Sequence, residues 1–532
     1  MSPPYDLNFA LALVPALLML VAALCGRSRR ASVRHLWRQF IGLSIAALVF
    51  SLLALITQMS LVPADASMRA QSDGWLAANL FGAWVSVLVQ FLGVAIGIFS
   101  SRHLEGEPRQ AVYIAALAAV LSSVHFLLLA NHWAVLIAAW AAIEWAMHYL
   151  LCFYKDRPFA LLAAHKKMVT DRAADGLLIA AAVLSWTEVG SGSFSALWVH
   201  IEAGHASAAL AWSGICLALA VIARTALMPV HGWLVQVMEA PTPVSALLHA
   251  GVVNLGGYVL VLFAPLLGVS LVARWLLVIF GLVSAVVAGL VLLTRVSQKV
   301  HLAWSTIAQM GFMVLECGLG LYLFAALHLL GHSLYKAHNF LNASSAVEES
   351  NRKLVTGASE NSSFSMIIAV PVALIVVFSL QSLTNSHAWP WWWSAVLALA
   401  WAPLLWVPKA TPGRAGVVAV RVATALAAAA FLTLVTSVMD HVPVGADNDP
   451  LDAAGLVALI GMGAMYLEMA AFQLWPRSVV VARRWVYAGF YMDEGYTHWV
   501  LILWPARWAG ADSKIAPAPW VLSEPVSGPS KS

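Results

Sequence analysis

Charged residues are scarce in this chain. Asp, Glu, Lys and Arg make up only 10% of its 532 residues, whereas hydrophobic residues make up 61%. Because soluble globular proteins carry about 25% charged residues, this composition excludes an ordinary soluble protein and predicts a polytopic membrane protein. The net charge of +4 needs no nucleic-acid partner to explain it.

Cysteine is scarce as well. Cys25, Cys152, Cys216 and Cys317 are scattered and form no CxxC pair, so the sequence supports neither a disulfide framework nor a cysteine metal site. It also lacks a convincing catalytic metal site, nucleotide-binding loop or nucleophile. We therefore expect no cofactor in this chain and no enzymatic activity of its own.

Apolar runs of about 20 residues are what the chain has in abundance. Fifteen candidate spans fall near 7–25, 40–61, 76–99, 111–130, 133–153, 168–187, 207–224, 243–264, 270–293, 301–320, 322–347, 364–384, 388–407, 415–438 and 455–475. The predicted fold is all-α, a membrane bundle of about 14–16 transmembrane helices. The first span lacks a basic segment before it and a cleavage pattern after it, so we expect a permanent helix.

The loops differ in charge. The loops after odd-numbered spans carry most of the Lys and Arg, including Lys166 and Lys167. The opposite loops are nearly free of Lys and Arg apart from Arg69 and Arg274, and the loop 439–454 is acidic. The positive-inside rule then places the N-terminus outside and the C-terminus in the cytoplasm.

Several ionisable residues lie within the apolar spans. A charge at bilayer depth costs roughly 2.5 to 3.5 kcal/mol on insertion scales, so a series of them indicates a proton or ion path. They are Glu144, Arg224, His249, Lys299, His328, His332, Lys336 and His338.

Simpler interpretations remain open for some of them. Glu144 could be a structurally paired carboxylate, and Lys299 could be a positive anchor at a span end. His328 and His332 could bind zinc, although no third ligand is evident. Their spacing with Lys336 places three titratable groups on one helix face, which favours a proton wire.

The chain divides into a membrane bundle over 1–475 and a cytoplasmic or interfacial segment over 476–532, of which the Pro- and Ser-rich part 511–532 is expected to be disordered. Pro229, Pro241 and Pro243 follow Arg224 closely. Since proline frees backbone groups in a spanning segment, a broken helix is expected there.

Three motifs in a fixed order carry a resemblance. They read MEAPTPVSALLHA over 238–250, RVSQKVHLAWSTIAQMGFM over 295–313 and HLLGHSLYKA over 328–337. Together they resemble the proton-translocating antiporter subunits of respiratory complex I and of Mrp-type cation/proton antiporters. The resemblance covers about 75–350, the expected core of the ion path.

This resemblance implies roles for particular residues. Matching positions are Arg172 and Asp175 at the start of the sixth span, His249 in the eighth, the central Lys299, and the eleventh-span wire of His328, His332 and Lys336. Two departures stand out: Arg224 lies at or near a family lysine, and Glu144 lies one helical turn from the family glutamate. Because arginine effectively cannot lose its proton, we expect Arg224 to be a fixed counter-charge for Glu144. The family's later intramembrane Lys or Glu has no counterpart in 364–384 or 388–407.

One branch of the family fits best. The extra His338 and the segment YAGFYMDEGYTH over 487–498 resemble the membrane subunit of Dab-type inorganic-carbon transporters. That resemblance implies a location in a bacterial inner membrane. It also implies a large peripheral cytoplasmic zinc protein as partner (DabA-like), similar in chemistry to a β-carbonic anhydrase, with the zinc on the partner chain.

The sequence therefore predicts a membrane subunit that conducts H⁺ or Na⁺ and couples the gradient to the hydration of CO₂ to bicarbonate on the partner. Two alternatives remain: an ion-translocating subunit of a complex I, hydrogenase or Mrp-type assembly, and a non-conducting membrane anchor for a peripheral enzyme.

Overall fold

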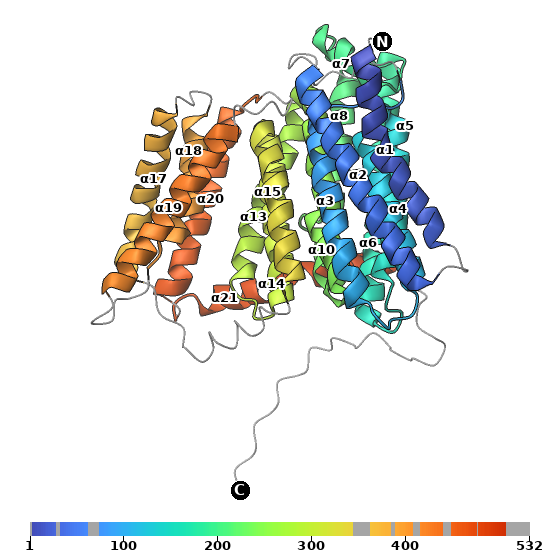
Figure 1. The fold of residues 1–532 in the computed structure, drawn as a ribbon. Coiled ribbons are helices and arrows are strands. Elements are labelled where there is room, and N and C mark those ends of the chain that lie inside the picture. Colours follow the sequence, from blue (N-terminus) through green and yellow to red (C-terminus); the bar gives the residue numbers. More distant parts are fainter. Residues whose placement is uncertain are drawn as a thin grey trace.

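A computed structural model describes residues 3–27, 32–61, 74–343, 362–384, 389–407, 415–439, 448–475 and 477–506. Within these ranges the regular structure is helical, and the chain forms a bundle of long helices (Figure 1). Eleven helical segments among the described residues are long and apolar enough to cross a membrane, with Thr242–Leu262 counted as one. The predicted all-α membrane fold is confirmed.

The first half of the bundle contains six long helices. They are α1 (Pro3–Gly26), α2 (Val33–Leu61), α3 (Leu80–His103), α4 (Gln110–Leu128), α5 (Trp133–Leu151) and α6 (Pro158–Val189). The short α7 (Phe194–Glu202) then leads to α8 (Ala208–Arg224). The helix α6 is long enough to span but less apolar than the others, because it holds several ionisable residues of the site described below.

The second half begins with short pieces and continues with long helices. In chain order they are α9 (Gly232–Gln236), η1 (Val237–Glu239), α10 (Thr242–Ala250), η2 (Val252–Asn254), α11 (Leu255–Leu262), α12 (Ala264–Val269), α13 (Leu271–Leu292), α14 (Gln298–Leu319), α15 (Tyr322–Leu341), α17 (Ser363–Leu383), α18 (Trp391–Trp401), η3 (Ala402–Leu405), α19 (Ala415–Met439) and α20 (Asp452–Leu474). Over its described residues, each of the fifteen predicted spans coincides with a helix of the first or second half or, at 243–264 and 388–407, with consecutive shorter helices.

The chain breaks after Arg224, as predicted. The helix α8 ends there, and helical structure resumes only at α9. A second break, which the sequence did not predict, divides the eighth span at Gly251 between α10 and α11. Here Asn254 Nδ2 donates to the Ala250 carbonyl oxygen at 2.9 Å and to Ser333 Oγ at 2.6 Å. Since a carbonyl freed at bilayer depth must find a polar partner, this asparagine stabilises the break.

The helices form consecutive groups along the bundle. In Figure 1, α17 to α20 stand at one end, α13 to α15 in the middle and α1 to α6 at the other end. The C-terminal helices α21 (Val480–Tyr487) and α22 (Met492–Leu503) follow α20; α21 contacts α13, and α22 contacts α6 and α9. The C-terminal segment therefore runs from the last helix group back to the first.

The helices α13 and α14 approach each other unusually closely. A Cβ atom added to Gly281 would lie 2.7 Å from the Gly311 carbonyl oxygen, and one added to Gly318 would lie 2.8 Å from the Val278 backbone nitrogen. No real Cβ tolerates such distances. Glycine is therefore needed along this contact so that the two backbones can touch, as in other tightly packed membrane helices.

Candidate ion path

The first cluster of charges lies between α5 and α6. Lys167 Nζ contacts the carboxylate of Glu144 and lies 2.7 Å from Asp171 Oδ2. All three side chains are at most 5% exposed. A cavity of about 240 Å³ adjoins them and is also lined by His148 and Arg172. Sequence reasoning missed Lys167, which it counted among the positive charges of a loop.

The pair expected between Glu144 and Arg224 does not form. Arg224 Nη2 instead contacts the carboxylate of Asp175, and the guanidinium lies 4.5 Å from the Trp140 ring centroid. The spacing of the charged residues on α6 explains this pairing. Lys167, Asp171 and Asp175 recur every four residues on α6 and so form one stripe, which gives Glu144 and Arg224 a partner each on α6.

The first cluster is therefore an alternating line of charges. Asp175 also accepts from Arg172 Nη2 at 3.0 Å, but the Arg172 side chain is 51% exposed and lies at the edge of the line. Two nitrogens of Arg224, Nε and Nη1, have no hydrogen-bond partner among the described residues. The predicted residues Glu144, Asp175 and Arg224 thus share one site, joined by Lys167 and Asp171.

A second cluster forms where α10, α14 and α15 meet. Lys336 Nζ donates to Ser305 Oγ at 2.7 Å and to the Leu302 carbonyl oxygen at 3.2 Å. On the next residue of α14, Thr306 Oγ1 lies 3.0 Å from His249 Nδ1. Lys336 and His249 are buried. The structure therefore brings these two predicted residues together through neighbouring hydroxyl groups of α14.

Lys299 lies in the first turn of α14, near one end of the second cluster. Its Nζ donates to Thr242 Oγ1 at 3.1 Å, within the Pro-Thr-Pro motif that opens α10. The side chain is only partly buried. Lys299 is thus placed between the solvent-exposed end of α14 and the buried cluster.

The helix α15 extends the second cluster away from Lys336. The rings of His328 and His332 lie 5.9 Å apart, and His328 Nδ1 lies 2.9 Å from Glu316 Oε2. The predicted shared face is present in the structure. His338 departs from it: this residue is exposed, because two residues beyond Lys336 the helix has turned by about 200°.

The zinc alternative for the α15 histidines finds no further ligands. The described part of the chain holds no group of three or more His, Cys, Asp or Glu side chains placed to bind a metal ion. The partner of His328 is instead Glu316, a buried carboxylate on α14 that sequence reasoning missed. Its signal was a lone acidic residue inside the apolar stretch VLECG.

The C-terminal helix α22 contacts α6 next to the first cluster. Asp493 contacts Lys166 Nζ and accepts from Gln236 Nε2 at 3.0 Å. Lys166 has no exposed side-chain surface and also donates to Thr497 Oγ1 at 2.7 Å. Burial raises the pKa of Tyr496, so its hydroxyl stays protonated and donates to the Lys166 carbonyl oxygen at 3.1 Å. The C-terminal segment is thus bound one residue away from Lys167.

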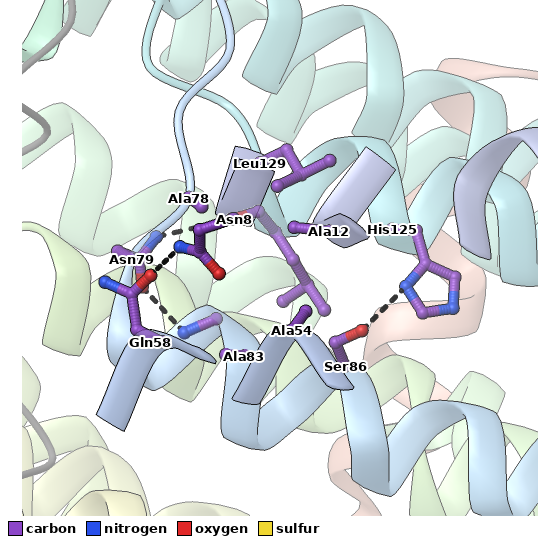
Figure 2. A pocket seen from close by; sticks show the side chains of 12 residues that line it. Asn8, Ala12, Ala54, Gln58, Ala78, Asn79, Ala83, Ser86, His125 and Leu129 are labelled. Carbon is purple, nitrogen blue, oxygen red and sulfur yellow. Dashed lines mark hydrogen bonds between the residues drawn. The ribbon is translucent and has the colours of Figure 1, made fainter. Parts of the chain in front are cut away.

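A separate polar cavity lies among α1 to α4 (Figure 2). Asn8, Gln58, Ser86 and His125 line it, and His125 Nδ1 lies 3.2 Å from Ser86 Oγ. The other ring nitrogen, Nε2, lies 2.9 Å from Gln90 Oε1. Both nitrogens of this histidine have partners, and the cavity lining contains no Asp, Glu, Lys or Arg. We therefore do not include it in the ion path.

Fold and site together define a membrane subunit of the antiporter type, with buried charges in two clusters. Comparison with known proteins agrees: residues 130–397 match the family described as NADH:quinone oxidoreductase/Mrp antiporter, transmembrane region. The chain belongs to this family.

Individual relatives refine the placement. The chain is 36% identical to a probable inorganic carbon transporter subunit DabB of Hydrogenovibrio crunogenus, over 81% of this chain and 86% of that protein. It is 39% identical to a probable subunit DabB2 of Halothiobacillus neapolitanus, over 63% of this chain and 62% of that protein. The resemblance drawn from the sequence motifs is confirmed.

Solved structures agree in fold. A chain of the Mrp complex from Dietzia sp. DQ12-45-1b superposes with a TM-score of 0.58 and 19% identity, covering 94% of this chain and 62% of that chain. A chain of an archaeal membrane-bound sulfane sulfur reductase gives a TM-score of 0.52 at 16% identity, covering 86% of this chain and 75% of that chain.

Proposed function

We propose that this chain is the proton- or Na⁺-conducting membrane subunit of an inorganic-carbon uptake complex. The observation that carries the proposal is the pair of buried clusters, one built on Lys167 and one on Lys336. Ionisable groups at this depth are costly and usually mark proton or ion routes. The relatives named as inorganic carbon transporter subunits support the choice of cargo.

The side chains of the two clusters differ in whether they can exchange protons. Arg224 keeps its charge under all ordinary conditions, so it acts as a fixed cation in contact with Asp175. Lysine, histidine and carboxylate side chains can exchange protons. We assign proton transfer to Glu144, Lys167 and Asp171 in the first cluster, and to Lys299, His249, Lys336, His332 and His328 in the second.

The hydration of CO₂ takes place on a partner protein. We propose a large cytoplasmic zinc protein, similar in chemistry to a β-carbonic anhydrase, in which CO₂ is hydrated to bicarbonate. A membrane potential of 100 mV supplies about 2.3 kcal/mol for each charge that crosses. That free energy would bias a near-reversible hydration by about fifty-fold. The proposal places the complex in a bacterial inner membrane, with the C-terminus of this chain in the cytoplasm.

Co-expression with the product of the neighbouring gene tests the proposal. We expect a stable complex that contains zinc, restores growth at ambient CO₂ in a host without carbonic anhydrase, and loses uptake when a protonophore or Na⁺ ionophore collapses the gradient. If uptake persists after the gradient is collapsed, the chain is only an anchor for its partner. A complex that contains further antiporter-like subunits and no zinc protein would instead indicate a complex I, hydrogenase or Mrp-type assembly.

A further inference from the structure

Glu316 is a buried carboxylate to which the proposed function gives no role. It lies in the last turn of α14 and is 3% exposed. It is also the only Asp or Glu within α13, α14, α15, α17 and α18. Because an ionised carboxylate at this depth is costly unless it is paired, its single described partner, His328, requires an explanation.

Glu316 continues a line of titratable groups that α15 begins. Lys336, His332 and His328 follow at intervals of four residues, so they lie along one helix face. Glu316 Oε2 accepts from His328 Nδ1 at 2.9 Å, which adds a fourth group at the far end. Between the ends, both ring nitrogens of His332 are buried without a partner among the described residues. A histidine with free ring nitrogens can pass a proton to either neighbour.

The Glu316 end of this line lies close to one face of the bundle. Two residues further on, the Gly318 carbonyl oxygen accepts from Arg274 Nε at 3.2 Å. Arg274 Nη1 also pairs with Asp449 Oδ2 at 2.9 Å, and the Asp449 side chain is 68% exposed. The other end of α14 adjoins the C-terminal segment, where Arg295 lies 5.5 Å from the Tyr487 ring centroid. The line therefore leads toward the face opposite α21.

We propose that Glu316 is the carboxylate through which protons enter or leave the α15 line at the face that carries the α14–α15 turn. Outward, Glu316 Oε2 takes the proton from His328 Nδ1 while another proton reaches His328 Nε2 from the side of His332. Glu316 then releases its proton to solvent, and the reverse sequence moves a proton inward. The ring ends neutral in both directions but carries its proton on the other nitrogen. Tautomerisation through water or rotation of the ring must therefore precede the next transfer in the same direction, and no other group is needed.

The inference rests on the proposed function, and one experiment separates the two. Purified wild-type complex and variants are placed in vesicles with an internal pH-sensitive dye, and proton flux is measured under an imposed potential. Glu316→Gln keeps an oxygen that can accept from His328 but cannot carry a proton. We expect it to lower the flux by at least about a hundredfold, the lower range for a positioned proton-transfer group.

Asp452→Asn is the matched control. Asp452 is also a carboxylate that holds a neighbouring side chain, accepting from Trp392 Nε1 at 2.8 Å, but it belongs to no titratable line described above. We expect normal flux. Glu316→Asp should retain part of the flux with a shifted pH profile, which a purely structural role for the carboxylate would not produce.

The outcomes are distinct. If the wild-type complex carries neither protons nor Na⁺, the proposed function fails and the role of Glu316 fails with it. If it carries Na⁺ and no protons, the proposed function stands and only the inference about Glu316 is overturned. If the wild type conducts and Glu316→Gln conducts within threefold of it, only the inference about Glu316 is overturned. Should Glu316→Gln fail to insert, His328→Gln is measured instead, with the same loss expected and the same threefold limit.

Discussion

The contact between Lys166 and Asp493 gives a sharp prediction about the C-terminal segment. Lys166 has no exposed side-chain surface, whereas Asp493 is 30% exposed on α22. Asp493→Asn preserves the shape of the side chain but leaves the buried ammonium without its nearest anion. We therefore expect the substitution to release α22 from α6 while the membrane bundle stays folded.

The magnitude follows from the burial of the pair. Removing one member of a fully buried ion pair costs about 3–5 kcal/mol. Because Asp493 is partly exposed and solvent screens its charge, we take the lower limit, about 3 kcal/mol. Converted to an equilibrium constant, this weakens the docking of α22 roughly a hundredfold.

Hydrogen exchange read by mass spectrometry measures this effect. Peptides from α22 should exchange about a hundredfold faster in Asp493→Asn than in the wild type, while peptides from α13 and α14 should be unchanged. Glu494→Gln is the control, because Glu494 is the exposed neighbour of Asp493. Protection of α22 within threefold of the wild type would refute the role of the pair. The double variant Lys166→Met/Asp493→Leu should recover much of the protection, since apolar replacement of both partners removes the unpaired charge.

Three further predictions concern transport and partner binding. Lys336→Ala and Lys299→Ala should each abolish uptake at matched expression with insertion intact, and near-normal uptake in either would remove that lysine from the path. In double-mutant cycles of proton flux, Glu144→Gln should couple to Lys167→Met by about 0.5–3 kcal/mol but combine additively with Arg224→Ala; the opposite pattern would restore the pair expected from the sequence. Deletion of 507–532 should leave partner binding intact if docking uses α21 and α22, and loss of the partner would place the docking surface in the deleted part.

Much of the fold follows from the sequence because apolar length is a strong signal. Runs of about 20 apolar residues have few structural options in a membrane. The prolines after Arg224 predicted the first break in the helices. The break at Gly251 was less visible. It depends on a hydrogen bond from Asn254 to Ser333, seventy-nine residues further along the chain, and no local pattern reports a contact of that range.

The candidate site was predicted less completely. Residues on one helix face, such as His328, His332 and Lys336, could be grouped by spacing alone. Ion pairs between helices could not be predicted in this way, because the spacing of residues within one helix does not show which neighbouring helix they face. Arg224 was therefore matched with Glu144, although Asp175 is its partner, and Lys167 was counted as a loop charge.

The close contact between α13 and α14 has a consequence for how the protein can move. Helices that touch backbone to backbone at Gly281 and Gly311 cannot slide past each other without collision, so the two form one rigid unit. Ser305, Thr306 and Glu316 all belong to that unit. Any rearrangement that opens or closes the route must therefore occur in its neighbours, by swinging α15 or by flexing α10 and α11 at Gly251, while the α14 side of the route keeps its geometry throughout the transport cycle.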